Sequence, residues 1–170
     1  MRCAPIVEMT GQMTLVPDGS AGTFAAVRQL RRLIDMGKTD LEVIQAATSI
    51  VYLTPQKDDC AEASAIYQWV RDHVRYQRDP VGVETIAAPR TTLRRMVGDC
   101  DDQVAVLGAL LESAGYPVRL VIGAFREAGL WEHVWLQVWC DGQWLDADPT
   151  EPHELGWAPP HALTVWTERR

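Results

Sequence analysis

The chain has 170 residues, of which 16 are basic and 23 acidic, so its formal net charge at pH 7 is −7. Hydrophobic residues make up 47% and charged residues 23%, a composition that favours a folded globular chain over a disordered one. The acidic balance leaves no surplus of Lys and Arg to neutralise phosphates, so we expect no nucleic-acid partner. No apolar run approaches the roughly 20 residues that cross a bilayer. The first residues lack the apolar stretch of a secretory signal, and we therefore expect a cytoplasmic protein without a membrane span.

The N-terminal third of the chain predicts weak strands followed by helices. Short alternating apolar stretches before residue 17 favour one or two strands. Apolar residues then recur at helical spacing from Phe24 onwards, and Gly37 follows as a stop. Thr39 and Glu42 fit a capping box in which Thr39 caps a second helix. This helical part is expected to cover about residues 20–55.

Three further helices are predicted in the middle of the chain. Asp58 or Asp59 can cap the first of them, whose apolar face includes His73, which we interpret as a packed residue rather than a ligand. Residues 77–89 are rich in Pro and Gly and predict a loop, which a short helix follows at about residues 91–96.

The strongly apolar last helix and a set of strands complete the chain. The helix starts at Cys100 and stops at Gly115. The strands are expected at residues 118–125, 132–140 and 143–148. Asp141 and Gly142, between the last two strands, predict a hairpin turn. Because helices come first and antiparallel strands follow, we predict one α+β domain that spans residues 1–170.

Four cysteines stand about 40 to 57 residues apart, at Cys3, Cys60, Cys100 and Cys140. They form no CxxC pair, so structural zinc is not expected. We predict no metal and no cofactor. Without a secretory signal, disulfides are not expected either, and each cysteine is interpreted as a reduced thiol.

Cys100 differs from the other cysteines because it begins a helix. The unpaired N–H groups there favour a thiolate, which a nucleophilic cysteine requires. Its neighbours Asp99, Asp101 and Asp102 oppose ionisation and offer an alternative interpretation as cation ligands with His133, although three such acids lack the spacing of a calcium loop.

The predicted hairpin brings a histidine near a carboxylate. If Asp141-Gly142 is the turn, Cys140 lies opposite Gln143, and His133 and Asp148 become diagonal neighbours on one face, within side-chain reach. A carboxylate that orients an imidazole is half of a catalytic triad, and Cys100 could complete it. The alternative is a polar pair at the surface of the sheet.

Four motifs in this order resemble the transglutaminase-like superfamily. They are Gly98-Asp99-Cys100, Gly115-Tyr116-Pro117-Val118-Arg119, His133-Val134-Trp135 and Trp144-Leu145-Asp146-Ala147-Asp148-Pro149-Thr150, after a family-like helix from Ile66 to Tyr76. The resemblance covers about residues 60–150 and implies a papain-like core with Cys100 as nucleophile, His133 as base and Asp148 as the residue that orients the base.

The chain departs from the family pattern directly after the nucleophile, where acids stand in place of the frequent aromatic residue. No motif fixes the group that stabilises the oxyanion, so Gln68, Trp69 and the backbone N–H of Cys100 are the candidates. Trp135, Trp69 and Trp131 are candidates for a substrate-binding wall, with sheet and core packing as the alternative.

The leading hypothesis is a thiol-dependent acyl-transfer enzyme for protein or peptide substrates. Water as the second substrate makes it a protease or amidase, and an amine makes it a cross-linking transglutaminase. Residues 80–86 and 155–160 also look similar to those of compact members of the superfamily encoded by bacteriophages. The alternative is therefore a non-catalytic phage structural or assembly protein, associated with other virion proteins, that uses the same fold for binding.

Overall fold

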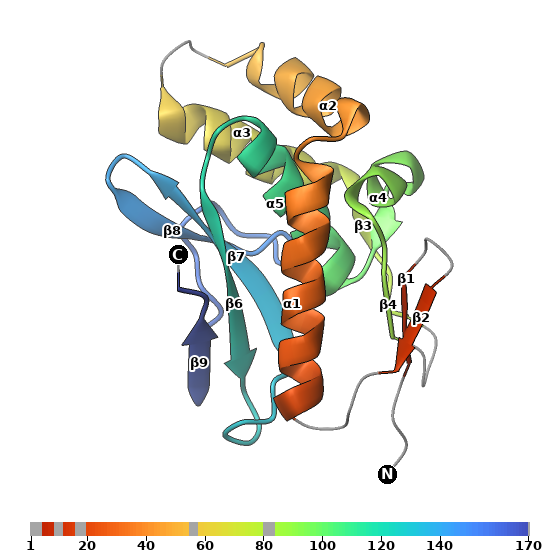
Figure 1. Cartoon of the computed structure of the whole chain (residues 1–170). Helices are drawn as coiled ribbons and strands as arrows, with labels where there is room; N and C mark the ends of the chain where they lie inside the picture. Colours follow the sequence, from red (N-terminus) through yellow and green to blue (C-terminus); the bar gives the residue numbers. More distant parts are fainter. Residues whose placement is uncertain (1–4, 9–11, 16–19, 55–57, 80–83, 170) are drawn as a thin grey trace.

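The computed structural model describes the chain except residues 1–4, 9–11, 16–19, 55–57, 80–83 and 170 (Figure 1). Its helices are α1 (Ser20–Gly37), α2 (Leu41–Val51), α3 (Asp59–His73), α4 (Pro89–Arg95) and α5 (Cys100–Ser113). Its strands are β1 (Pro5–Glu8), β2 (Gln12–Leu15), β3 (Arg75–Tyr76), β4 (Glu84–Ile86), β5 (Val97–Gly98), β6 (Val118–Ala124), β7 (His133–Cys140), β8 (Gln143–Ala147) and β9 (Thr164–Thr167). Helices beside a small antiparallel sheet confirm the α+β prediction. None of the helices in the described ranges is long and apolar enough to cross a bilayer.

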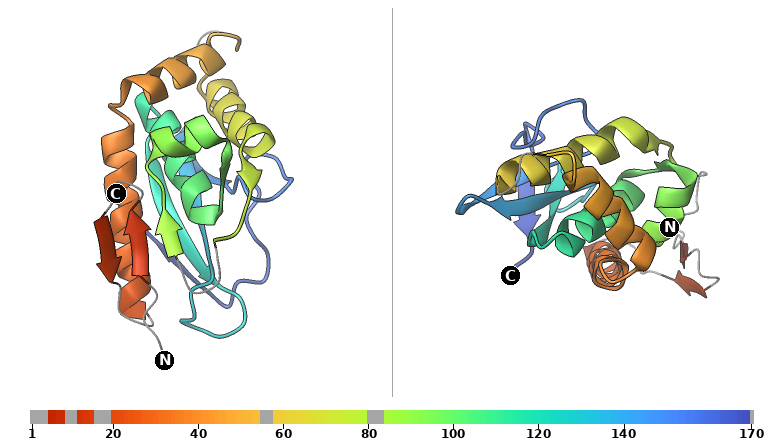
Figure 2. Two further views of the ribbon diagram at one scale, coloured as in Figure 1. Left: turned by 90° about the vertical axis from the view of Figure 1, so that its right-hand side faces the viewer. Right: turned by 90° about the horizontal axis from the view of Figure 1, so that it is seen from above.

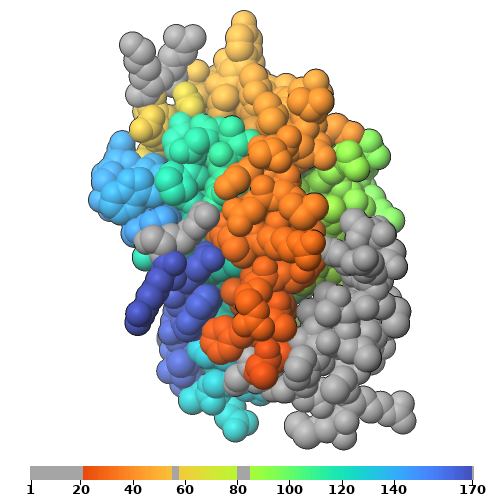
Figure 3. All heavy atoms as spheres, viewed as in Figure 1, coloured from red at the N-terminus to blue at the C-terminus, as the bar shows by residue number. Residues whose placement is uncertain are grey.

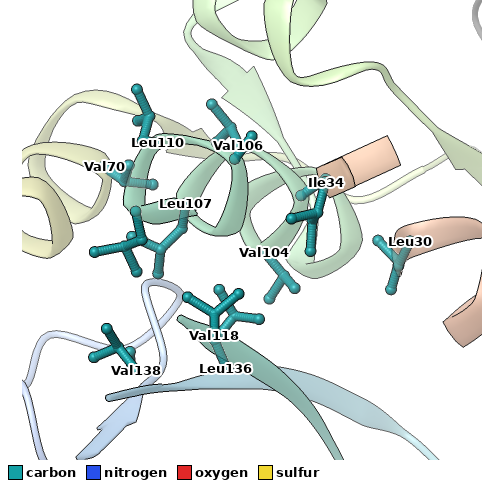
Figure 4. Close-up of a cluster of buried hydrophobic side chains, with 14 of the residues drawn as sticks. Leu30, Ile34, Val70, Val104, Val106, Leu107, Leu110, Val118, Leu136 and Val138 are labelled. Atoms are coloured by element: carbon teal, nitrogen blue, oxygen red, sulfur yellow. The ribbon is translucent and has the colours of Figure 1, made fainter. Parts of the chain in front are cut away.

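Helix α5 lies at the centre of the molecule. Every residue from Asp102 to Leu111 is buried, so the helix has no solvent-facing side. It contacts α1, α2, α3 and α4, and its remaining side packs on β6 and β7 (Figures 1 and 2). Figure 4 shows the core that results, with side chains of α5 between those of α1, α3 and the sheet: Leu30, Ile34, Val70, Val104, Val106, Leu107, Leu110, Val118, Leu136 and Val138. Helix α1 covers α5 on the outside, where it forms much of the face seen in Figure 3.

The main sheet has the strand order β8-β7-β6-β9, with all neighbours antiparallel. Cys140 lies opposite Gln143, which confirms the predicted hairpin register. Leu136 and Val138 of β7 belong to the core beside α5, whereas Trp139 is partly exposed. Because strand side chains alternate, His133 lies on the same side of β7 as Trp135 and Trp139.

Several strands were not predicted. Strand β4 lies inside the segment expected to be a loop and pairs in parallel with β1. Strands β3 and β5 have two residues each, and β9 pairs with β6 although it follows a proline-rich segment. Short strands like these have too few residues to show a period-2 pattern, and distant partners complete them.

One of the predicted helix caps is confirmed, and another is wrong. Asp58 caps α3, as expected, by accepting a hydrogen bond from the N–H of Ala61. At α2 the cap is Asp40 rather than Thr39, because the Asp40 carboxylate accepts the hydrogen bond from the N–H of Glu42. The hydroxyl of Thr39 instead donates to the carbonyl of Met36 at the end of α1.

Two cysteines that were expected to be reduced form a disulfide. Cys60 on α3 and Cys140 at the end of β7 are bonded, with their Cα atoms 5.5 Å apart. The expectation of reduced thiols is therefore wrong for these two residues, because helix α3 places Cys60 against the strand end despite a separation of 80 residues in sequence. Cys100 is a free cysteine. Cys3 lies outside the described residues.

Reduction of the disulfide should destabilise the fold. The bond closes a long loop, so its loss restores conformational freedom to the unfolded chain and should lower the free energy of unfolding by about 2 to 4 kcal/mol. Urea denaturation with and without a reductant measures the difference. The double variant Cys60→Ala and Cys140→Ala is the control, because its stability should not respond to the reductant. A wild type whose free energy of unfolding does not respond to the reductant either would contradict the disulfide.

Candidate functional site

The start of α5 is built from a glycine, a capping acid and Cys100. Asp99 is the N-cap, and its carboxylate accepts hydrogen bonds from the N–H groups of Asp101 and Asp102. A Cβ at Gly98 would lie 2.4 Å from the Cβ of Asp102, so a glycine is required here for close approach. The carbonyl of Gly98 also accepts a hydrogen bond from the N–H of Gln77, which ties the helix start to the end of β3.

The thiol of Cys100 is partly buried and donates to the Asp101 carboxylate, with 3.8 Å between Sγ and Oδ1. Burial first, and then the charges of Asp101 and Asp99, raise the pKa of Cys100 well above its ordinary value. These effects act against the helix N-terminus, which the sequence predicts to favour the thiolate. Burial and then the charge of Cys100 raise the pKa of the Tyr76 hydroxyl, so Tyr76 lies within electrostatic range of the thiol.

Asp102 points away from the thiol and into the protein. Its carboxylate accepts a 2.6 Å hydrogen bond from the N–H of Ala87, the residue after β4. Only 7% of Asp102 is exposed, and this burial raises the pKa of its carboxyl group to about 7. Asp99 and Asp102 thus have structural roles at the helix start.

His133 and Asp148 form a hydrogen-bonded pair, as the hairpin register predicts. His133 Nε2 lies 2.7 Å from Asp148 Oδ2, and Asp148 is fully buried. The other carboxylate oxygen accepts two hydrogen bonds from Thr150, at 3.1 Å from its N–H and 2.6 Å from its hydroxyl. The backbone carbonyl of Asp148 lies 2.9 Å from the hydroxyl of Tyr67 on α3. The carboxylate is therefore fixed in place, and with it the plane and position of the imidazole.

A hydrogen-bonded network supports the imidazole from behind. The ring of Trp135 stacks on that of His133, with 5.9 Å between centroids. The Trp135 indole donates to Asp146 at 2.7 Å, and Gln137 donates to the same carboxylate oxygen at 2.9 Å. Gln137 in turn accepts a hydrogen bond from Arg119, the arginine of the Gly-x-Pro-x-Arg motif. Several motif residues therefore act on the position of one histidine.

A pocket of about 420 Å³ opens beside the histidine and the carboxylate. It is lined by Phe125, His133, Asp148, Glu151, Trp157, Pro159 and Pro160. Sequence reasoning missed Glu151 and Trp157 in this role, because they follow the last motif in a segment without regular structure. A carboxylate and an indole within ten residues of the Asp-Pro-Thr motif are the signal that could have found them.

The three tryptophans proposed from the sequence lie in different places. Trp135 contacts the histidine and is 2% exposed. Trp69 is half-buried on α3 and stacks on His73. Trp131 packs edge-on against Phe24, and its buried indole N–H has no hydrogen-bond partner among the described residues. The lining of the pocket contains none of the three.

In the described part of the chain, no three His, Cys, Asp or Glu side chains come together in a way that could hold a metal ion. The acids around Cys100 diverge, since Asp99 caps the helix and Asp102 binds the N–H of Ala87. This arrangement gives the alternative of a cation site at Asp99, Asp101, Asp102 and His133 no support.

Residues 46–149, more than half of the chain, match the family model of the transglutaminase-like superfamily. Comparison with proteins of curated function found no match.

Solved structures share this fold at low sequence identity. A "putative protease" from Parabacteroides distasonis has a TM-score of 0.61 at 13% identity, over 81% of this chain and 27% of that one. Calcium-bound LapG of Legionella pneumophila has a TM-score of 0.58 at 16% identity, over 82% of this chain and 83% of that one. A "putative cysteine protease" from Cytophaga hutchinsonii has a TM-score of 0.51 at 14% identity, over 75% and 48%. The chain thus spans about a quarter of the first protein and about half of the third.

Asp102 should make stability depend on pH. Its carboxyl group has a pKa of about 7 in the fold, against 3.8 ordinarily, so the folded protein binds this proton more tightly than the unfolded chain. The protonated Asp102 carboxyl group therefore contributes stability that is fully present below about pH 4 and is lost as the pH rises through about 7. Asp102→Asn keeps an acceptor for Ala87 and removes the charge.

Urea denaturation of the wild type and Asp102→Asn at pH 4 and pH 8 measures this effect. We expect the stability of the variant relative to the wild type to rise by about 2 to 4 kcal/mol between these pH values. The matched control is Asp141→Asn, which removes an exposed carboxylate at the hairpin turn, where φ is 48° and asparagine is tolerated. A relative stability of Asp102→Asn that is the same at both pH values would contradict the assignment.

Removal of the Asp101 charge should make Cys100 more reactive. Asp101→Asn takes away a charge that raises the pKa of the Cys100 thiol, so more thiolate is present at a given pH. The rate of alkylation of Cys100 by iodoacetamide at pH 7 to 9, followed by site-resolved mass spectrometry, should rise several-fold. Asp141→Asn should leave the rate unchanged. An equal or lower rate in Asp101→Asn would show that this carboxylate does not restrain the thiol.

Proposed function

Because the chain belongs to the transglutaminase-like superfamily, we propose that it is a thiol-dependent acyl-transfer enzyme that acts on amide bonds in protein or peptide substrates. In this proposal Cys100 is the nucleophile, His133 the general base and Asp148 the residue that orients the base. The observation that supports it most strongly is the 2.7 Å hydrogen bond between His133 Nε2 and the buried Asp148 carboxylate. Burial of a carboxylate costs free energy, and hydrogen bonds offset this cost.

The pair leaves one ring nitrogen for chemistry. Since Asp148 engages Nε2, the nitrogen that exchanges a proton with Cys100 is Nδ1. The Asp148 carboxylate holds the tautomer and stabilises the imidazolium that forms. Because the pKa of the Cys100 thiol is raised, the resting thiol is neutral, and the thiolate forms as its proton moves to His133 during attack.

The proposed reaction has two halves. In the first, the proton of the Cys100 thiol moves to His133 Nδ1 and the sulfur attacks the carbonyl carbon of the amide. The C–N bond then breaks, His133 returns the proton to the leaving amine, and a thioester remains. In the second half, His133 takes a proton from water, the resulting hydroxide attacks the thioester carbon, and the C–S bond breaks. The Cys100 thiolate recovers the proton from His133, and a carboxylic acid is released.

The oxyanion of the tetrahedral intermediate needs donors near Cys100. The N–H of Cys100 belongs to the first turn of α5, where the Asp99 side chain occupies the N–H groups of Asp101 and Asp102 instead. We assign the Cys100 N–H as one donor. Gln68, considered from the sequence, is engaged with Ser64 and Glu154, and Trp69 stacks on His73.

We favour hydrolysis over cross-linking. The proteins from Parabacteroides and Cytophaga that share the fold are described as a "putative protease" and a "putative cysteine protease", and this supports water as the acceptor. The superfamily also includes transglutaminases, in which an amine replaces water in the second half-reaction with the same residues.

Loss of Cys100 should abolish activity without unfolding the protein. Cleavage of a denatured protein mixture, identified by mass spectrometry of new termini, and incorporation of a fluorescent amine into casein together cover both acceptors. Cys100→Ala should remove either activity, because no other group forms the thioester. Its free energy of unfolding should change by less than about 1 kcal/mol, because one sulfur is removed at a helix start.

Asp148→Asn should reduce the rate about a thousandfold or more, since the imidazole loses its orientation, while Asp141→Asn should retain full activity. Activity that persists in Cys100→Ala would contradict the proposal. A wild type that is inactive in both assays but binds a partner as well as Cys100→Ala does would favour a binding module on the same fold.

A further inference from the structure

The pocket beside His133 adjoins the base and the carboxylate of the proposed triad. Its lining includes both His133 and Asp148 but not Cys100. In the proposed reaction the sulfur bonds to the acyl carbon, whereas the imidazole gives its proton to the leaving nitrogen. Because the imidazole of His133 lines the pocket, the pocket is placed to hold the substrate residue that carries the leaving nitrogen. This step rests on the proposed function.

The pocket has an uncompensated negative charge. Its two carboxylates are Asp148, which is hydrogen-bonded to His133, and Glu151, and none of the described residues that line it is a Lys or Arg. Among the described residues, no side chain donates a hydrogen bond to the Glu151 carboxylate. Nearby arginines are paired with other acids, Arg71 with Asp72 and Glu154, and Arg126 with Glu132.

The other walls suit the aliphatic stem and charged end of a basic side chain. Phe125 and Trp157 supply aromatic rings, and Pro159 and Pro160 supply apolar surface without N–H groups. Aromatic faces attract cations, and apolar walls accept the methylenes of Lys or Arg while the head reaches a carboxylate. A volume of about 420 Å³ suffices for such a side chain.

The walls are held in place before any substrate arrives. Trp157 stacks on His153, with 4.0 Å between ring centroids. The carbonyl of His153 accepts a 2.7 Å hydrogen bond from Arg71 and lies 2.9 Å from the Tyr67 hydroxyl. Helix α3 thus anchors the segment that carries Glu151 and Trp157, so little ordering is needed on binding.

From these observations we propose that the pocket selects a positively charged side chain on the residue directly after the cleaved bond, so that the substrates are peptides cut before Lys or Arg. Glu151 is the specificity-determining residue, and Trp157 and Phe125 form the walls around the cation. A peptide with an acidic residue at this position is excluded by the same charge.

Binding of product-like peptides tests the pocket without catalysis. The probes are the tripeptide amides Lys-Ala-Ala, norleucine-Ala-Ala and Glu-Ala-Ala, which share an N-terminal ammonium and differ in one side chain. Isothermal titration calorimetry on the full-length wild type at low salt should give about tenfold tighter binding for the Lys peptide than for the norleucine peptide. The Glu peptide should bind most weakly. Equal affinities, or no binding of any probe at millimolar concentration, would overturn the proposal.

Variants at Glu151 locate the effect. Glu151 is exposed, so its replacement should not disturb the fold. Glu151→Gln should remove the preference for Lys over norleucine, and Glu151→Lys should reverse it in favour of the Glu peptide. Asp141→Asn removes one carboxylate at the far end of β7 and should keep the wild-type preference. Unaltered selectivity in Glu151→Lys would place any cation preference elsewhere.

The outcomes separate this inference from the proposed function. Cleavage that depends on Cys100 but shows no preference for Lys or Arg after the cut bond would overturn the pocket assignment and leave the enzyme intact. Selective binding of the Lys peptide by a protein that lacks Cys100-dependent activity would do the reverse. In that case the pocket would be a cation-binding site on a non-catalytic member of the fold.

Discussion

The complete burial of helix α5 is the constraint on which the rest of the structure depends. From Val104 to Leu111 the helix has no polar face, so other elements must enclose it on all sides. Helices α1 to α4 and the sheet do so, and each is thereby fixed relative to the first turn of α5. Cys100 stands at that turn, where the core ends. Apolar packing of the helix thus sets the position of the first turn, and the hydrogen bonds of Asp99 and Asp102 hold the backbone around the thiol.

A second constraint comes from Asp148, whose carboxylate is removed from water entirely. A buried charge requires hydrogen-bond partners, and here His133 and Thr150 supply them. The backbone around it is held by Tyr67, whose pKa burial raises to about 12 and whose hydroxyl also contacts the carbonyl of His153. The pair of His133 and Asp148 is therefore held by α3, while the thiol of Cys100 is held by α5. Because α3 and α5 pack against each other, both halves share one core.

The sequence predicted the features that depend on local pattern. The apolar run of α5, its stop at Gly115 with φ of 96°, and the hairpin register that brings His133 to Asp148 follow from spacing and turn chemistry. What it missed depends on distant contacts. Strand β9 forms only against β6, and Glu151 belongs to a pocket only because α3 holds its segment. The Cys60–Cys140 bond was missed because the inference of reduced thiols used the cellular compartment, whereas pairing depends on the distance between α3 and β7.

The roles of the catalytic candidates and the nearby acids remain predictions, but the electrostatics of the site are consistent across its parts. Asp99 and Asp101 raise the pKa of the thiol, and Glu151 places a further carboxylate in the adjoining pocket. Each opposes the approach of an anionic substrate, as does the overall charge of −7. A resting thiol that is neutral reacts slowly with stray electrophiles. A cationic substrate in the pocket, by contrast, places a positive charge near His133 that disfavours the imidazolium. His133 would therefore give its proton readily to the leaving amine, which is the step that breaks the C–N bond. In this interpretation the acids keep the resting Cys100 thiol neutral, and a cationic substrate assists only the later proton transfer, from His133 to the leaving amine.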